Sequence, residues 1–320
     1  MGVQNQASAD TANTLFMAYA EDLFARVGES GIYDHICEII DTDAEVNEID
    51  ILETMPALRE WIGPKRFDSV RLSTFSVAMK SYEKSFEIPR RKLAGMTIPA
   101  LEKRIQTWLN NFTMIYDKLA IALIVSNPTC YDGVALASAS HVRGPAGATQ
   151  SNITTSAFSV ANHKAIVSAM QSLCDENSEP FEISPNLIVC GPKTLSAVLE
   201  VTKSTTRLAA VDNAGAETGT RVAAATIDNV FAGAELYGGG SMLVICSKRL
   251  IGTYDDYVLY LDTTKGCKPV IGFRKRAPEV TSMTEMTSPD RFKRDVYQWS
   301  VEVDIVFAPG AWQVLHFLLV

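Results

Sequence analysis

The chain has 320 residues, of which 47% are hydrophobic and 21% are charged. This composition excludes a disordered chain and is sufficient for a sizeable buried core in one large domain or two. The net charge of -8 argues against a protein that coats nucleic acid by simple charge attraction.

The cysteines show no CxxC motif and no paired spacing, which is typical of a reduced, intracellular protein rather than of a disulfide scaffold. No charged and then apolar leader opens the chain, so we expect no signal peptide and, without a recognisable propeptide, no N-terminal cleavage. No apolar run is long enough to cross a bilayer, and the sequence predicts a soluble protein made in a cytoplasm.

Residues 1–60 show weak helical patterns without the apolar density of a self-contained core, which predicts an arm with short helices that packs on another body. The arm is acidic, with thirteen Asp and Glu residues against two Arg. Residues 64–104 carry ten Lys and Arg residues against four acids. Two explanations fit this distribution: complementary surfaces that meet between subunits, or ordinary solvated faces.

Residues 67–92 alternate in the manner of strands. Tyr82, Phe86 and Ile88 share one face, and the polar residues between them share the other. The apolar positions of 70–79 predict the preceding strand, so the two strands would form a hairpin. A two-stranded hairpin is too thin to be stable alone, and it must therefore lie on another body.

A long helix is predicted over residues 97–125. Thr97 can cap its start, Pro99 suits its first turn, and Asn127-Pro128 stops it. At 1.5 Å per residue it would be about 40 Å long, which fits either a long core helix or the backbone helix of a shell subunit. Its apolar residues recur three or four positions apart along one face: Leu101, Ile105, Trp108, Phe112, Ile115, Leu119 and Leu123.

The rest of the chain mixes helices and strands without a regular βαβ alternation, which predicts an α+β fold class. A long loop is expected at 127–155, a mobile loop at 205–221 and a polar turn region at 278–294. Helices are predicted at 161–173 and 193–204. Strands are predicted at 186–190, 241–246, 257–262, 268–276, 296–307 and 311–320.

The sequence predicts no catalytic residue, no cofactor and no metal site. The turn at residues 191–194 lies between a strand and a helix, but it lacks the GxxxxGK[ST] spacing of a phosphate loop and contains Pro192. Asp255 and Asp256 fit a turn better than a catalytic pair. The histidines are too dispersed for a metal motif, and for His141 a structural hydrogen bond is the favoured role.

Six stretches follow one another along residues 58–317: LREWIGPKRF, SVAMKSYEKSFEIPRRKL, YDGVALASASH, NLIVCGPKTLSAVLEVTKS, YVLYLDTTKGCKPVIGFRKRAPEV and VYQWSVEVDIVFAPGAWQVLHF. In this order they resemble the Mu-type major head (capsid) subunits of tailed bacteriophages and prophages, whose shells use the Hong Kong 97-type fold. The fifth stretch matches strongly, through Asp262, Lys268-Pro269, Phe273, Arg274 and Pro278. One departure is Lys92-Leu93-Ala94, which stands where the family usually has an acidic pair.

The resemblance implies a division into five parts. These are an N-terminal arm at 1–65, an extended β-hairpin loop at 66–95, a peripheral domain with the spine helix at 96–159, an axial domain at 160–262, and C-terminal strands at 263–320 that return to the peripheral domain. The expected contacts between subunits lie on the hairpin and the arm, at Glu45, Glu48, Lys80, Tyr82, Lys84, Arg90 and Arg91.

The implied function is that of a major capsid protein that self-assembles into pentamers and hexamers of an icosahedral shell around double-stranded DNA. We expect it in the virion, after assembly in the bacterial host cytoplasm, with scaffolding, portal and decoration proteins as partners, and with no membrane contact. The DNA would be enclosed without sequence-specific binding. Three alternatives stay open: an encapsulin-like nanocompartment shell, a non-shell ring, and a soluble nucleotide-dependent enzyme that uses the Gly191–Thr194 turn.

Overall fold

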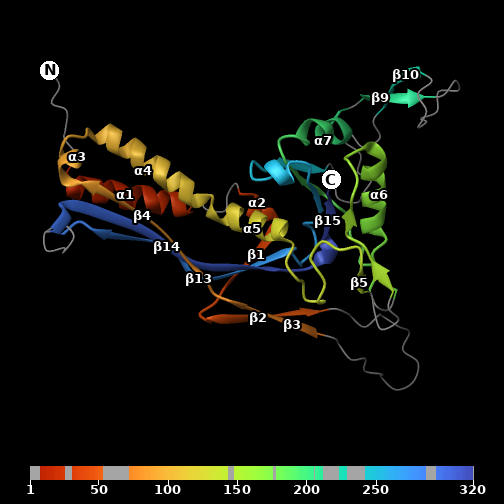
Figure 1. The fold of residues 1–320 in the computed structure, drawn as a ribbon, viewed down its shortest axis with the longest axis horizontal. Coiled ribbons are helices and arrows are strands. Elements are labelled where there is room, and N and C mark those ends of the chain that lie inside the picture. Colours follow the sequence, from red (N-terminus) through yellow and green to blue (C-terminus); the bar gives the residue numbers. More distant parts are fainter. Residues whose placement is uncertain are drawn as a thin grey trace. The chain divides into compact units, whose positions relative to one another are not determined.

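The computed structural model describes residues 8–25, 31–52, 72–142, 148–175, 178–204, 206–211, 223–228, 242–285 and 293–319 (Figure 1). The chain divides into two compact units. Unit 1 comprises Met1–Glu48, Ser76–Ala120 and Ile271–Ala308, and unit 2 comprises Ile49–Phe75, Ile121–Val270 and Pro309–Val320. Both units contain helices and strands, so the predicted α+β class is confirmed.

Unit 1 is built on a four-stranded sheet with the order β1-β13-β14-β4. Its strands are β1 (Cys37–Asp41), β13 (Val270–Met283), β14 (Val296–Pro309) and β4 (Ser81–Pro89). β4 runs antiparallel to β14, with Phe86 opposite Trp299. The alternation predicted for β4 is confirmed, because Glu83, Ser85 and Glu87 are exposed while the residues between them are buried or half-buried.

An aromatic cluster joins this sheet to two helices of unit 1, α1 (Ala9–Ala25) and α4 (Ile98–Thr113). Phe16 of α1 lies with its ring centroid 5.5 Å from that of Trp108 of α4. Phe86 lies 4.7 Å from Trp108 and stacks on Trp299 at 5.2 Å. Aromatic pairs at these separations add about 0.5–1.5 kcal/mol beyond their buried area. The cluster therefore fixes the helices on one face of the sheet.

The predicted long helix is present in two pieces, α4 and α5 (Ile115–Ser126), which meet at a turn at Met114. In α4 the predicted face is buried, as Leu101 and Ile105 show. The side chain of Phe112 lies outside the described residues. In α5 the prediction is wrong by one position, because Ile115, Leu119 and Leu123 are half-buried while the residues that follow each of them, Tyr116, Ala120 and Ile124, are buried. The turn at Met114 shifts the phase of the helix.

The predicted pairing of the strands in 67–92 with each other is also wrong. β3 (Leu72–Ala78) pairs with β2 (Val46–Leu52), whereas β4 pairs with β14 over nine residue pairs. The longer pairing with β14 places Phe86 and Ile88 over the apolar face that the helices cover, which buries more surface than a free hairpin would. The first residues of the predicted hairpin, 66–71, lie outside the described part of the chain.

Unit 2 contains a five-stranded sheet with the order β11-β8-β12-β15-β7. Its strands are β11 (Leu243–Cys246), β8 (Leu187–Cys190), β12 (Val258–Leu261), β15 (Leu315–Leu318) and β7 (Ile153–Thr154). Every residue of β8, β12 and β15 is buried. β11 and β8 are parallel, while β12 is antiparallel to both of its neighbours. The predicted strands at 186–190, 241–246 and 257–262 are confirmed.

The helices of unit 2 also follow the prediction. α6 (Val160–Gln171) begins after Ser159, whose hydroxyl accepts a hydrogen bond from the backbone N–H of Asn162. α7 (Leu195–Thr202) follows β8. Two further pairs of strands are β5 (His141–Val142) with β6 (Thr149–Gln150), and β9 (Thr206–Val211) with β10 (Ala223–Asp228). β9 contradicts the first part of the mobile loop expected at 205–221, because its backbone pairs with β10, and residues 212–221 lie outside the described chain.

Near the C-terminus two boundaries differ from the prediction. β13 continues to Met283, through the first part of the expected turn region, because it stays paired with β14. The expected strand at 311–320 is shorter, since a 3-10 turn, η2 (Trp312–Val314), precedes β15. Small elements complete the description: α2 (Ile32–Ile36), α3 (Arg90–Ala94) and η1 (Gly252–Tyr254).

Candidate functional site

Two acidic residues expected at subunit contacts lie where the arm enters β2. Glu45 forms an ion pair with Lys275 of β13, and its carbonyl oxygen accepts a hydrogen bond from the backbone N–H of Met79 at 2.8 Å. Glu48 is exposed on β2. Glu45 is therefore engaged within its own chain, while the side chain of Glu48 faces solvent.

The residues expected on the hairpin, which lie on β4 or directly before it, take three different roles. Lys80 is exposed, and its carbonyl oxygen accepts from the backbone N–H of Ile305 at 3.0 Å. Tyr82 is half-buried, and that burial raises the pKa of its phenol. Lys84 lies with its Nζ 5.4 Å from the ring centroid of Trp108, within the range of a cation–π interaction. Lys84 thus contributes to the packing of unit 1.

The two arginines expected at the interface lie on α3. The backbone N–H of Arg90 donates to the carbonyl of Asp295 at 3.0 Å, and its guanidinium lies 3.8 Å from the carboxylate of the same residue. Arg91 is exposed. The structure therefore does not bring the seven expected residues together into one contiguous group.

Two acids of the described arm, Asp41 and Glu45, have basic partners in β13 of the same chain. The Nε and Nη2 atoms of Arg274 donate to the two carboxylate oxygens of Asp41 at 2.7 and 3.0 Å. The hydrogen bond from Arg274, together with its charge, lowers the pKa of Asp41 against a smaller opposing effect of desolvation. Lys275, the next residue, pairs with Glu45. The sequence shows that this strand ends in basic residues. It does not show which acids they bind, because the partners lie about 230 residues apart.

The next residue of this run, Arg276, ties β13 to β14. Its Nε donates to Oδ2 of Asp304 at 3.0 Å, and its Nη1 lies 3.2 Å from the carboxylate of Glu302. The pKa of Asp304 is lowered, first by a hydrogen bond from the Ser81 side chain and then by Arg276. Three consecutive bases thus bind acids of three different segments of unit 1.

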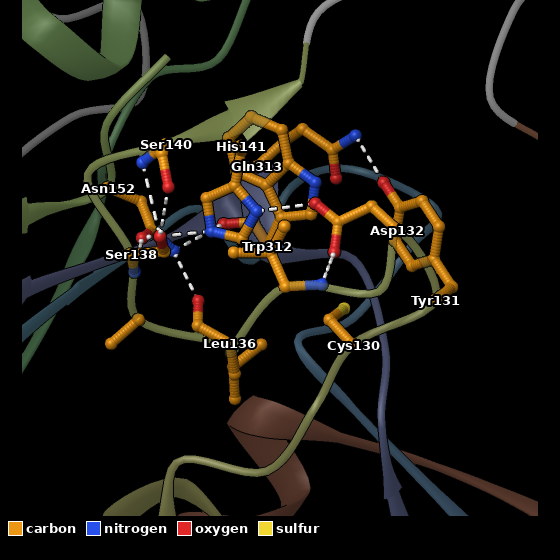
Figure 2. Close-up of polar contacts among 12 residues, drawn as sticks. Cys130, Tyr131, Asp132, Leu136, Ser138, Ser140, His141, Asn152, Trp312 and Gln313 are labelled. Atoms are coloured by element: carbon orange, nitrogen blue, oxygen red, sulfur yellow. Dashed lines mark hydrogen bonds and ion pairs between the residues drawn. The ribbon is translucent and has the colours of Figure 1, made fainter. Parts of the chain in front are cut away.

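A buried polar cluster in unit 2 is centred on Asn152 (Figure 2). Its Nδ2 donates to the carbonyl oxygens of Leu136 at 2.7 Å, Leu315 at 3.2 Å and Trp312 at 3.4 Å. Its Oδ1 accepts from the backbone N–H of Ser138 at 2.8 Å. One fully buried amide therefore satisfies polar groups of the 127–155 loop and of the C-terminal segment at the same time.

His141 extends this cluster. Its ring stacks on the indole of Trp312 with centroids 4.0 Å apart and an interplanar angle of 3°. Its Nε2 lies 3.2 Å from Oδ1 of Asn152, and its Nδ1 lies 2.5 Å from Oδ2 of Asp132. Because the amide oxygen can only accept, Nε2 carries a hydrogen and donates it.

The cluster is structural rather than catalytic. Both ring nitrogens of His141 are occupied, one ring face is covered by Trp312, and the side chain is fully buried. No atom of the imidazole is left to bind a substrate or a metal, and the expected structural role of His141 is confirmed. Asn152 was missed, because a single Asn in a polar loop looks in sequence like any surface residue.

The Gly191–Thr194 turn has a structural explanation. A Cβ atom at Gly191 would lie 2.6 Å from the carbonyl oxygen of Leu250 and 3.0 Å from that of Asp255, so only glycine allows this close approach. The Nζ of Lys193 is bound by the carboxylates of Asp255 and Asp256. These acids occupy the lysine that a nucleotide phosphate would need, and their charge repels phosphate.

In the described part of the chain, no group of three or more His, Cys, Asp or Glu side chains is placed to bind a metal ion. Within the same residues, no helix has the length and apolar character needed to cross a membrane. The ion pairs of β13 and the Asn152 cluster both serve to join distant segments. In both places the polar side chains stabilise the fold.

Comparison with known proteins assigns this structure. A family model described as Mu-like prophage major head subunit gpT matches residues 13–161 and 244–317, well over half of the chain. The chain belongs to this family of major head subunits. No curated protein matches it in sequence. The family is one of structural capsid proteins, and this membership removes the ground for the enzyme alternative.

Solved structures show the same fold at low sequence identity. The mature capsid of bacteriophage PhiM1 aligns with a TM-score of 0.54 and 9% identity, over 91% of this chain and 87% of that chain. A structure from Microbacterium phage Oxtober96 aligns with a TM-score of 0.53 and 13% identity, over 90% of each chain. A virus-like particle from Pyrococcus furiosus aligns with a TM-score of 0.50 and 13% identity, over 94% and 98%. The Hong Kong 97-type capsid fold predicted from the sequence is confirmed.

Proposed function

We propose that this head subunit assembles into pentamers and hexamers that close an icosahedral shell around the double-stranded DNA of a tailed bacteriophage. The observation that carries this proposal is the family match over residues 13–161 and 244–317, on a chain that has the capsid fold. Self-assembly into a shell follows from that membership. Scaffolding, portal and decoration proteins as partners, and assembly in the bacterial cytoplasm, belong to the same proposal.

The proposed mechanism is association by many copies of a modest interface, closed by symmetry. The five-part division remains a prediction: 66–95 would lie over a neighbouring subunit, and 160–262 would meet its copies around the symmetry axes. Among the seven residues expected at contacts, four have side chains that no ion pair or cation–π contact engages within the described chain: Glu48, Lys80, Tyr82 and Arg91. Their availability supports them as contacts to a neighbour.

The test is negative-stain electron microscopy of the purified protein beside light scattering. We expect closed shells or rings of five and six subunits, with a scaffolding protein co-expressed if the subunit alone stays small. A protein that gives only particles near 35 kDa, with and without the scaffold, contradicts the proposal. DNA in the particles supports the phage-head proposal, whereas a co-purifying enzyme cargo would indicate an encapsulin-like compartment.

A further inference from the structure

The helical side of unit 1 carries a concentration of positive charge. Residues 90–104 hold five bases and one acid in a chain whose net charge is -8. Four of these bases, here called the α3–α4 basic surface, are exposed: Arg91, Lys92, Lys103 and Arg104. The one acid of this segment, Glu102, is half-buried. The charge is therefore local, and the overall composition does not explain it.

These four bases lie close together along the chain and in space. α3 ends at Ala94, and α4 begins at Ile98. The connection is a tight turn, in which the backbone N–H of Gly95 donates to Lys92 and that of Met96 donates to Leu93. From the start of α4, Lys103 is only about 8 Å along the helix axis. Figure 1 shows α3 beside the first turn of α4.

Within the described chain the four bases have no acid partner, unlike four other basic residues of unit 1. Arg274, Lys275, Arg276 and Arg294 each bind a carboxylate of the same unit. Among the residues that the structure describes, no ion pair engages any base of the α3–α4 basic surface. A group of like charges without counter-charge repels itself, so it is stabilised by an external anion.

Several of the acids that a second copy could offer are already bound within their own chain, whereas others, such as Glu48 and Glu83, are exposed. In the described arm, Asp41 and Glu45 are already bound by Arg274 and Lys275. On the polar face of the sheet, Glu87 is bound by Arg294, and Glu302 and Asp304 are bound by Arg276. Duplex DNA, in contrast, offers about one phosphate charge per 1.7 Å of helix axis.

We propose that the α3–α4 basic surface contacts the phosphate backbone of double-stranded DNA without reading its sequence. This inference rests on the proposed function, since it supposes a shell that encloses DNA, and it assigns Arg91 to DNA rather than to a neighbouring subunit. The other charges of the chain keep the subunit negative overall, so the contact is confined to one face. Phosphate contacts of this kind provide positioning and salt-dependent affinity.

The test measures binding of a random-sequence DNA duplex by fluorescence anisotropy at several NaCl concentrations. The variant is Lys103→Gln/Arg104→Gln, which keeps good helix formers on an exposed face. Each lost phosphate contact lowers the slope of log K against log salt by about 0.9, so between 50 and 200 mM NaCl the wild-type affinity should fall about tenfold more than that of the variant. A second variant, Arg91→Gln/Lys92→Gln, should show a similar change.

The matched control is Lys248→Gln/Lys265→Gln, which removes the same number of charges from unit 2. We expect it to behave like the wild type, and Lys103→Arg/Arg104→Lys to keep the wild-type salt dependence. Equal salt slopes for the wild type and the Lys103/Arg104 variant would overturn the inference, as would the absence of DNA binding by the wild type at low salt.

Electron microscopy of the same samples separates this inference from the proposed function. Shells formed by the wild type and by both Gln variants, with unequal DNA binding, support both. Shells without any difference in DNA binding overturn only the inference. Loss of shells in the basic-surface variants alone, while the control assembles, overturns the inference in favour of a subunit interface. Absence of shells from the wild type with scaffold contradicts the proposed function itself.

Discussion

The two units of this subunit are stabilised by different kinds of interaction. In unit 2 the three central strands of the sheet are entirely buried, and the polar groups among them are satisfied by buried hydrogen bonds such as those of Asn152. In unit 1 the sheet packs one face on helices, and its other face carries ion pairs that are partly exposed to solvent. Buried polar groups are costly to disrupt, whereas exposed ion pairs contribute little. The two units should therefore respond to different perturbations.

The largest effect is expected from Asn152→Ala. The substitution leaves three carbonyl oxygens, the N–H of Ser138 and the Nε2–H of His141 without this partner in a buried site. We expect a loss of about 3–5 kcal/mol in the free energy of unfolding, because each unsatisfied buried group costs about 1–3 kcal/mol. Urea unfolding followed by circular dichroism measures it. Gln171→Ala, at an exposed position of α6, is the control, and equal losses would contradict the role of Asn152.

The second effect concerns pH, and it is specific to unit 2. Burial lowers the pKa of His163, which is hydrogen-bonded to the Tyr260 hydroxyl, from 6.5 to about 4. Burial likewise lowers the pKa of His316, which contacts Thr154, to about 4. Both rings are therefore neutral in the folded state at neutral pH. The unfolded chain takes up these protons first as the pH falls below 6.5.

The stability that these histidines contribute is present above pH 6.5 and is lost as the pH falls toward 4. A difference of about 2.5 pKa units corresponds to on the order of 3 kcal/mol for each ring. We expect unit 2 to unfold first between pH 6 and 4, which hydrogen exchange of its strands would show. His316→Gln should flatten the pH dependence in this range. An unchanged profile would show that burial of this ring does not control the transition.

In unit 1, Asp41 and Asp304 have a pKa that is lowered in the folded state from the ordinary value of 3.8. Their contribution is present above that pH and is lost only as the pH falls below it. Between pH 6.5 and 4 these groups therefore remain charged. The same titration thus compares the two units within one molecule, and simultaneous unfolding of both would contradict the expected difference in their pH sensitivity.

A smaller effect is expected for Arg274→Gln in unit 1. The substitution removes the two hydrogen bonds to Asp41, a residue that is largely exposed. We expect a loss of about 0.5–1 kcal/mol that shrinks in 1 M NaCl, because salt screens exposed pairs. Urea unfolding at low and high salt measures the difference. Lys118→Gln, at an exposed position of α5, is the control and should show neither effect.

The smallest effect is expected for Lys193→Ala, in the turn of unit 2 that was considered as a phosphate loop. Lys193 is bound by Asp255 and Asp256, so the wild-type protein should give no binding heat with ATP, and the variant should not differ from it. Isothermal titration calorimetry makes the comparison. Binding that is present in the wild type and lost in the variant would reopen the nucleotide alternative.

The sequence predicted the elements better than their partners. The face of α4 at Leu101 and Ile105 and the alternation of β4 follow from local periodicity, and both were correct. The phase shift at Met114 was not predictable, since the apolar pattern of α5 fits two faces. The pairing of β4 with β14 depends on residues more than 200 positions away, such as Trp299 opposite Phe86. Local alternation specifies which face of a strand is apolar, but it does not determine which strand will pair with it.

For the candidate site, too, the residue types could be predicted from the sequence but their partners could not. The acidic arm and the basic end of β13 were both visible in the sequence, but their pairing required the fold to bring Arg274 to Asp41. His141 was correctly expected to form structural hydrogen bonds, whereas its partner Asn152 carried no signal. The family resemblance supplied the function, because six ordered stretches constrain the fold jointly while each alone is weak.

The decisive experiment is cryo-electron microscopy of particles purified from cells that express this subunit with a scaffolding protein. We expect closed icosahedral shells built from pentamers and hexamers of one chain, with unit 2 strands intact at neutral pH. Particles without a closed shell, or a chain that stays monomeric or dimeric under every co-expression, would contradict it.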